Sequence, residues 1–153
     1  MKDLEVMETR ALREDDLDAL INLYSFIHVS DDPLPEKPVV DAVWKEIQTH
    51  PFFIYFGVFV EERLISSCTL SIIPNLTRGC RPYGVIENVV THSKYRRKGF
   101  GKAVLQYAQE FAWRKNCYKI MLLTGRKDDG IYRFYESAGF DRQAKQAFLS
   151  KPK

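Results

Sequence analysis

The 153-residue sequence has only three cysteines and three histidines. The cysteines are odd in number, widely spaced and without a Cys-x-x-Cys pair, which argues against a disulfide framework and a cysteine-built zinc site. The histidines are equally scattered, so no metal site is expected. The residues concerned are Cys68, Cys80, Cys117, His28, His50 and His92.

Long apolar runs are also missing. The longest, Pro51–Val60, falls well short of the roughly 20 residues that a membrane-spanning helix needs. The first residues, Met1–Glu5, carry acids where a signal peptide has a basic patch followed by an apolar run. We therefore expect a cytoplasmic protein with no membrane partner.

Neither sign of charge is in large excess. The formal net charge is +3, and the composition of 45% apolar and 28% charged residues is ordinary for a soluble globular protein. No internal repeat, low-complexity segment or long linker divides the chain. A single domain over residues 1–153 is expected, and this length is sufficient to bury a core.

The first half of the chain begins with a short β pattern and continues as a helix. Acids at 14–16 suit the positive end of a helix, and apolar residues then recur at steps of three and four up to about His28. The expected elements are a strand at Val6–Ala11, a helix from Glu14 to about His28, a loop at Ser30–Pro38 and a short helix at Val39–Gln48.

The second half alternates β-rich segments with amphipathic ones. It predicts a hairpin of Phe52–Val60 and Leu64–Ile73, a loop at Pro74–Pro82, strands at Val85–Thr91, Lys119–Thr124 and Phe140–Leu149, and helices at Gly99–Lys115 and Asp129–Ala138. The fold class is α/β (α+β), with a mixed, mostly antiparallel sheet of about six to seven strands and helices on both faces.

A basic, glycine-containing turn lies between the strand Val85–Thr91 and the helix that follows. Its glycines let a ligand approach the backbone, and the first amides of the helix have no internal partners. The turn therefore suits an anion, although a solvated basic turn is the simpler alternative. It has neither the Gly-Lys-Ser/Thr ending of a Walker A loop nor the glycine spacing of a dinucleotide fingerprint. The residues are Arg96, Arg97, Lys98, Gly99, Phe100, Gly101 and Lys102.

Two motifs resemble those of one enzyme superfamily. Arg96–Gly101 resembles the Gln/Arg-x-x-Gly-x-Gly/Ala signature of the GCN5-related N-acetyltransferases (GNAT), and Phe134–Phe140 resembles the family's Phe-Tyr-x-x-x-Gly-Phe block. They occur in the family's order. The resemblance implies the GNAT fold and transfer of an acetyl group from acetyl-CoA to a primary amine, by direct attack in a ternary complex.

The resemblance also implies how acetyl-CoA binds. Backbone groups of Val89, Val90 and Thr91 would pair with the pantetheine arm as an added strand, and the amides of Arg97–Lys102 would hold the pyrophosphate. Seven residues before the motif's tyrosine the family often has an asparagine that contacts the cofactor. This sequence has Asp128 there, and an acid is less favourable beside an anionic ligand.

Two residues are candidates for proton transfer. Tyr135 matches the family's catalytic tyrosine and would protonate the departing thiolate; the alternative is that its ring only packs against the sheet. Glu87 is the candidate base, placed by strand alternation on one face with Val85, Val89 and Thr91. A structural ion pair is an equally acceptable interpretation of Glu87.

The acceptor pocket would lie, by the family plan, between the first two helices and the Ile73–Val85 loop. If the arginines there face the pocket, an acceptor with a carboxylate or phosphate is favoured. The short chain favours a small molecule over a protein. The candidate residues are Tyr24, His28, Arg78, Arg81 and Tyr83.

Two other functions compete with this one. Four cations within Lys94–Lys98 suggest a nucleic-acid-binding module, but the charge is local and we expect no nucleic-acid partner. A sensor that binds acetyl-CoA without catalysis is the second alternative. A homodimer, common in the family, is compatible with the sequence.

Overall fold

The computed structural model describes residues 6–28 and 30–153 and contains one five-stranded sheet. The strands follow their sequence order, β1-β2-β3-β4-β5; all neighbours are antiparallel except β4 and β5, which are parallel. Their bounds are β1 Met7–Ala11, β2 Phe53–Val60, β3 Arg63–Ile73, β4 Tyr83–Thr91 and β5 Ile120–Leu122. The mixed, mostly antiparallel sheet is confirmed, with five strands in place of six to seven.

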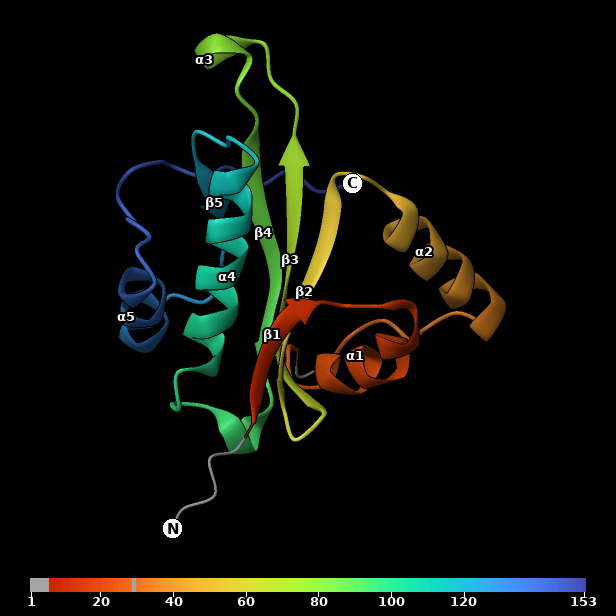
Figure 1. Ribbon diagram of the computed structural model, residues 1–153. Coiled ribbons are helices and arrows are strands. Elements are labelled where there is room, and N and C mark those ends of the chain that lie inside the picture. Colours follow the sequence, from red (N-terminus) through yellow and green to blue (C-terminus); the bar gives the residue numbers. More distant parts are fainter. Residues whose placement is uncertain (1–5, 29) are drawn as a thin grey trace.

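Helices cover both faces of the sheet, as expected. Figure 1 shows α1 and α2 on one side and α4 and α5 on the other. No helix in the described part of the chain is both long and apolar enough to span a membrane. The helices are α1 Leu17–Tyr24, α2 Lys37–Thr49, α3 Thr77–Cys80, α4 Phe100–Arg114 and α5 Asp129–Ser137, with 3₁₀ turns η1 Glu14–Asp16 and η2 Ser93–Tyr95.

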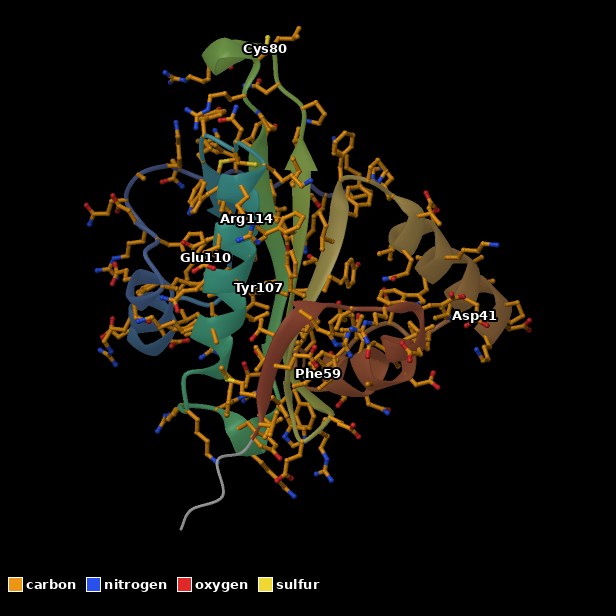
Figure 2. The ribbon with its side chains drawn as sticks, viewed as in Figure 1. Asp41, Phe59, Cys80, Tyr107, Glu110 and Arg114 are labelled. Carbon is orange, nitrogen blue, oxygen red and sulfur yellow. The ribbon has the colours of Figure 1, made fainter. Side chains whose placement is uncertain are left out.

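The main core lies between the sheet and α4. Apolar side chains of α4 recur at steps of one, three and four residues, which gives the helix one buried face. That face meets the alternate residues of the strands that point towards it. Figure 2 shows Tyr107 on α4, and its ring lies 5.4 Å from that of Phe56 on β2. The buried members include Val58, Cys68, Leu70, Ile86, Val104, Leu105 and Ala108.

A second, smaller core lies under α1 and α2. Trp44 of α2 is buried there, and its indole nitrogen donates a hydrogen bond of 3.0 Å to the carbonyl of Glu14. Arg10 of β1 places its guanidinium 3.9 Å from the centre of the Phe59 ring and forms a 2.6 Å ion pair with Asp16. These contacts fix the start of α1 to the edge of the sheet.

The strand predicted at Phe140–Leu149 is wrong. Asp141 instead closes a turn: its side chain accepts a 2.8 Å hydrogen bond from the amide of Gln143, and its carbonyl accepts one of 3.4 Å from Ala144. Phe148 and Leu149 are 91% and 80% exposed, so no apolar face anchors the segment to the sheet.

Other element ends also differ from expectation. The first helix ends at Tyr24 and not at His28, because the amides of Phe26 and Ile27 bond three residues back and close a turn. The predicted loop at Pro74–Pro82 contains α3, with a left-handed backbone at Arg78. β5 keeps only three of the six residues predicted for it.

Candidate active site

A gap in the strand pairing opens beside β4. Its residues Gly84–Ile86 pair with Ile120–Leu122 of β5, and the pairing stops there. From Glu87 to Thr91, no strand of the described chain pairs with the outer edge of β4. Unpaired backbone groups of such an edge can bind an extended ligand as an additional strand.

A β-bulge at Asn88 changes the direction of the side chains in this segment. Between the pairs Ser67–Val90 and Thr69–Glu87, β4 has two residues where β3 has one, and Asn88 has φ 51°. Val89 consequently packs with the core under α4. The predicted common face of Glu87, Val89 and Thr91 is therefore wrong: the bulge turns the last two to the other face.

Two carbonyls of the predicted pantetheine edge already accept hydrogen bonds. The Ser66 hydroxyl donates to Val90 O at 2.9 Å, and Arg96 Nε donates to Thr91 O at 3.1 Å. A carbonyl oxygen has two lone pairs, so both can still accept a second bond. These contacts connect the edge to β3 and to the turn before α4.

The turn before α4 has the backbone that its glycines predict. Gly99 has φ 88° at the N-cap, and Arg97 has φ 61°. Among the described residues, no side chain caps α4. Its first amides, at the positive end of the helix dipole, therefore have no side-chain acceptor. This is a suitable geometry for a pyrophosphate.

Gly101 also has a packing role that its sequence position did not reveal. It is buried, and an added Cβ would lie 3.0 Å from the Phe134 ring of α5 and 3.1 Å from the Thr91 hydroxyl. The missing side chain lets α5 approach the start of α4. The two sequence motifs, 96–101 and 134–140, are therefore in direct contact.

The basic residues of the turn have different environments. Arg96 bonds to backbone carbonyls, and the Lys98 ammonium lies 5.4 Å from the centre of the Tyr95 ring. Arg97 and Lys98 are exposed, and Lys102 is half-buried in the first turn of α4. A cofactor phosphate at the turn could reach these last three cations.

Tyr135 lies on the last turn of α5 beside the gap in the sheet. Its carbonyl accepts bonds from Ala138 and Phe140, and Gly139 has φ 94°, which ends the helix there. Burial raises the pKa of Tyr135; the charge of Arg126 lowers it and that of Glu87 raises it. The hydroxyl is therefore protonated at neutral pH, as a proton donor requires.

Glu87 and Tyr24 lie on the sheet face that α1 covers. Glu87 is exposed, and Thr69 donates a 3.1 Å bond to its carbonyl. The Tyr24 hydroxyl is buried and makes no hydrogen bond with any described residue. Burial raises the pKa of Tyr24; Asn88 lies near enough to lower it slightly, without the geometry of a hydrogen bond. A buried hydroxyl without a partner is available to a ligand.

A cavity of about 210 Å³ lies further along this face. The residues that line it are Tyr55, Thr69 and Ser71 together with the apolar Ile47, Phe53 and Leu70. No charged side chain is among the lining residues, so this part of the face suits an uncharged polar group.

The predicted acceptor residues fall into two groups at opposite ends of β4. Tyr24 and the exposed His28 lie near the turn that precedes α4. Arg78 lies on α3, at the far tip of the molecule (Figures 1 and 2). Tyr83 begins β4, and Arg81 donates 3.3 Å bonds to the carbonyls of Asn116 and Cys117, residues outside the predicted set.

The residues at the far end form an aromatic and cationic cluster. The Lys119 ammonium lies 5.1 Å from the Tyr83 ring and 5.3 Å from the Tyr118 ring. Arg78 lies 5.9 Å from the Tyr118 ring. Both cations thus lie over the Tyr118 ring, which is 6.3 Å from the Tyr83 ring. Alternation places Tyr83 on the same face as Glu87.

Asp128 acts as a helix cap. Its carboxylate accepts a 2.9 Å bond from the Ile131 amide and forms a 2.9 Å ion pair with Arg126. The first of these bonds lowers the pKa of Asp128 most; burial opposes it, and Arg126 lowers the pKa further. The cap orients α5, and with it Tyr135.

Sequence reasoning missed Asn88 and Tyr55. Asn88 interrupts a β-branched strand, and asparagine is among the residues that adopt positive φ most readily, so it was a detectable sign of a bulge. Nothing in the sequence distinguishes Tyr55 from its aromatic neighbours. Within residues 6–28 and 30–153, no three His, Cys, Asp or Glu side chains gather as metal ligands would.

Comparison with known proteins gives consistent matches. The model of the acetyltransferase (GNAT) family matches residues 17–140. A glucosamine 6-phosphate N-acetyltransferase of Trypanosoma brucei brucei is 33% identical over 97% of this chain and 99% of its own.

Two solved structures share the fold over almost their whole length. A protein from Agrobacterium tumefaciens, provisionally described as an acetyltransferase, is 40% identical, with a TM-score of 0.89 over 95% of this chain and 99% of that one. Glucosamine-6-phosphate N-acetyltransferase from Arabidopsis thaliana has a TM-score of 0.81 over 97% and 99%; at 23% identity it supports the fold alone.

Proposed function

The chain belongs to the acetyltransferase (GNAT) family and is an N-acetyltransferase of a small-molecule amine, and from this premise we propose that its acceptor is glucosamine 6-phosphate. The family and the activity predicted from the two motifs are confirmed. The observation that carries the proposed substrate is the match to the trypanosomal enzyme, which extends over nearly the full length of both chains.

Acetyl-CoA is the proposed donor, held at the gap beside β4. The pantetheine arm would pair with the backbone of Val89–Thr91. The amides and cations of 97–102 would bind the pyrophosphate, which places the thioester between Tyr135 and Glu87. Asp128 contributes through the position of α5, because its carboxylate is already bonded.

In the proposed reaction the acceptor nitrogen attacks the thioester carbonyl carbon directly. Glu87, alone or through a water, takes the proton that the amine loses as the C–N bond forms. The C–S bond then breaks, and the Tyr135 hydroxyl gives its proton to the departing thiolate. Holding both reactants beside β4 supplies much of the rate, since well-oriented pairs reach effective molarities of about 10⁵ M or more.

The acceptor phosphate has a candidate site in the cluster around Tyr83. Tyr83 and Glu87 are four steps apart along the strand, which is about 13 Å of backbone, and long side chains at either end can shorten this distance. Lys119 and Arg78 are flexible cations that could meet a phosphate from this end. Tyr24 and His28, at the other end, would contact the amine side of the sugar.

The test is the release of free coenzyme A thiol with a panel of amines. We expect glucosamine 6-phosphate to exceed glucosamine and glucosamine 1-phosphate in kcat/KM by at least about 10-fold, the value of one charge-assisted contact. Equal use of glucosamine would contradict the proposed substrate. Binding of coenzyme A with no thiol release for any amine would favour the sensor.

Two further parts of the proposal concern the setting of the reaction. We place it in the cytoplasm, and a homodimer stays a prediction from the family resemblance. Sedimentation of the purified protein would measure the oligomeric state directly. Double-stranded DNA should bind weakly at physiological salt, since the cations of the turn are few and local.

A further inference from the structure

Arg96 joins two parts of the chain that are far apart in sequence. Its Nε donates to Thr91 O at 3.1 Å, and its Nη2 donates to Phe26 O at 3.0 Å. Thr91 ends β4 on the donor side of the site, whereas Phe26 follows α1 on the acceptor side. The guanidinium therefore bridges the two halves of the site through backbone atoms.

Aromatic contacts run beside this bridge. The Phe26 and His92 rings lie 4.3 Å apart, and those of His92 and Tyr95 lie 5.5 Å apart. His92 is itself oriented, because its Nδ1 accepts a 3.2 Å bond from the Lys94 amide. These aromatic contacts thus extend from Phe26 to Tyr95 in the 3₁₀ turn η2, which directly precedes the proposed phosphate-binding turn.

The acceptor end of the bridge is next to a candidate substrate group. Phe26 stands two residues after Tyr24, whose buried hydroxyl has no described partner. The helix ends at Tyr24, and the bonds that hold the next residues come from within the same turn: the amides of Phe26 and Ile27 bond three residues back, and Ser25 Oγ donates a 2.8 Å bond to the carbonyl of Asn22. Arg96 supplies the bond from outside that fixes this exit from α1.

We propose that Arg96 is a positioning residue of the acceptor site: it holds the end of α1, and with it Tyr24, at a fixed place relative to the cofactor turn. This rests on the proposed function and deepens it, because the sequence pattern had assigned Arg96 to the cofactor. A guanidinium can donate to two carbonyls in fixed directions. A lysine ammonium in its place keeps the charge but lacks this planar arrangement of donors. Charge and geometry can therefore be separated experimentally.

The test compares Arg96→Lys and Arg96→Gln with Lys94→Gln. The control removes a cation two residues away, which is exposed and lies outside the proposed site. We expect both Arg96 variants to raise the acceptor KM about 10-fold, the effect of losing one bond that involves a charged group, and to leave the acetyl-CoA KM within twofold. Lys94→Gln should change neither constant by more than twofold. An acetyl-CoA KM that rises in Arg96→Gln and is restored by Arg96→Lys would overturn the proposal, since charge alone would then suffice.

A second readout does not depend on the identity of the acceptor. Amide hydrogen exchange of the intact protein should show faster exchange at Phe26 and Ile27 in both Arg96 variants and unchanged exchange in Lys94→Gln. Unchanged amide exchange at Phe26 and Ile27 in the Arg96 variants would show that Arg96 does not hold the end of α1. If the exchange result holds while wild type does not acetylate glucosamine 6-phosphate, the substrate is wrong and the bridge stands; the KM comparison then uses whichever amine the panel identifies.

Discussion

The two faces of the sheet differ in what they bury. The face under α4 and α5 buries a continuous apolar cluster and carries the two sequence motifs in mutual contact through Gly101 and Phe134. The face under α1 and α2 has a smaller core, a hydroxyl-lined cavity and the unpartnered hydroxyl of Tyr24. In the proposed function the first face binds the donor, and the polar groups of the second are available to the acceptor. Substitutions of Tyr135 and Gly101 on the donor face should impair turnover and stability, whereas loss of the Tyr24 hydroxyl on the acceptor face should impair substrate affinity.

Tyr135→Phe should have the largest effect on the donor face. It removes only the hydroxyl, so the ring contacts with Phe134 and Phe140 persist. If this hydroxyl protonates the thiolate, turnover falls by roughly 10²-fold or more, while acetyl-CoA affinity changes little. Steady-state kinetics together with a calorimetric titration measure both quantities. Turnover within a factor of three of wild type would show that Tyr135 only packs.

Gly101→Ala tests the packing of the two motifs. The added methyl group would lie 3.0 Å from the Phe134 ring and 3.1 Å from the Thr91 hydroxyl, so the ring or α5 must shift by a few tenths of an ångström. We expect the free energy of unfolding to fall by about 2 kcal/mol, as for other overpacked cores. Urea denaturation measures this change.

Gly125→Ala is the matched control for that substitution. An added Cβ at Gly125 has nothing within 4 Å, so stability should stay within about 0.5 kcal/mol of wild type. Equal destabilisation of both variants would mean that the contact between the motifs is not the cause.

Asp16→Asn tests how the acceptor face is attached to the sheet. Burial opposes the charge of Asp16, but hydrogen bonds from Arg10 and from the Arg13 amide leave its pKa lowered. We expect the variant to lose about 1.5 kcal/mol of unfolding free energy at pH 7, the value of a bond between charged groups. Chemical denaturation at neutral pH gives the number.

The same ion pair predicts a pH dependence. Because the folded pKa lies below the unfolded value near 4, the contribution of Asp16 is fully present above about pH 5. It is lost as the pH falls towards the folded pKa. The difference in stability between wild type and Asp16→Asn should therefore shrink below about pH 4. A difference that is constant down to pH 2 would assign the effect to packing.

Tyr24→Phe should have the smallest effect and the most selective one. Removing a buried hydroxyl without a partner should leave stability unchanged or raise it by up to about 1 kcal/mol. The acceptor KM should nevertheless rise about fivefold, the worth of one neutral hydrogen bond, with the acetyl-CoA KM unchanged. A destabilised variant with unchanged kinetics would show that the hydroxyl has a structural partner.

Local sequence was enough for the turn before α4. Two glycines, a run of cations and a strand before them predicted the turn, because φ angles, uncapped amides and charge are local properties. The helix predicted at Asp129–Ala138 was likewise found, and it ends at Ser137. The contact between the two motifs, through Gly101 and Phe134, was not predicted, because it joins residues of α4 and α5 that are far apart in sequence.

The tertiary structure decided what sequence patterns could not. Whether Val89 faces α4 or α1 depends on the bulge at Asn88, and one extra residue reverses every later side chain on the strand. The partners of Arg96 lie five and seventy residues away, so its charge was predictable and its geometry was not. The strand predicted at Phe140–Leu149 did not form. An alternating sequence becomes a strand only if it can pair with the edge of a sheet and bury its apolar side chains. The sequence thus determined the charge and the backbone of the turn, and the packing of α1 against the sheet determined which polar groups face the proposed acceptor site.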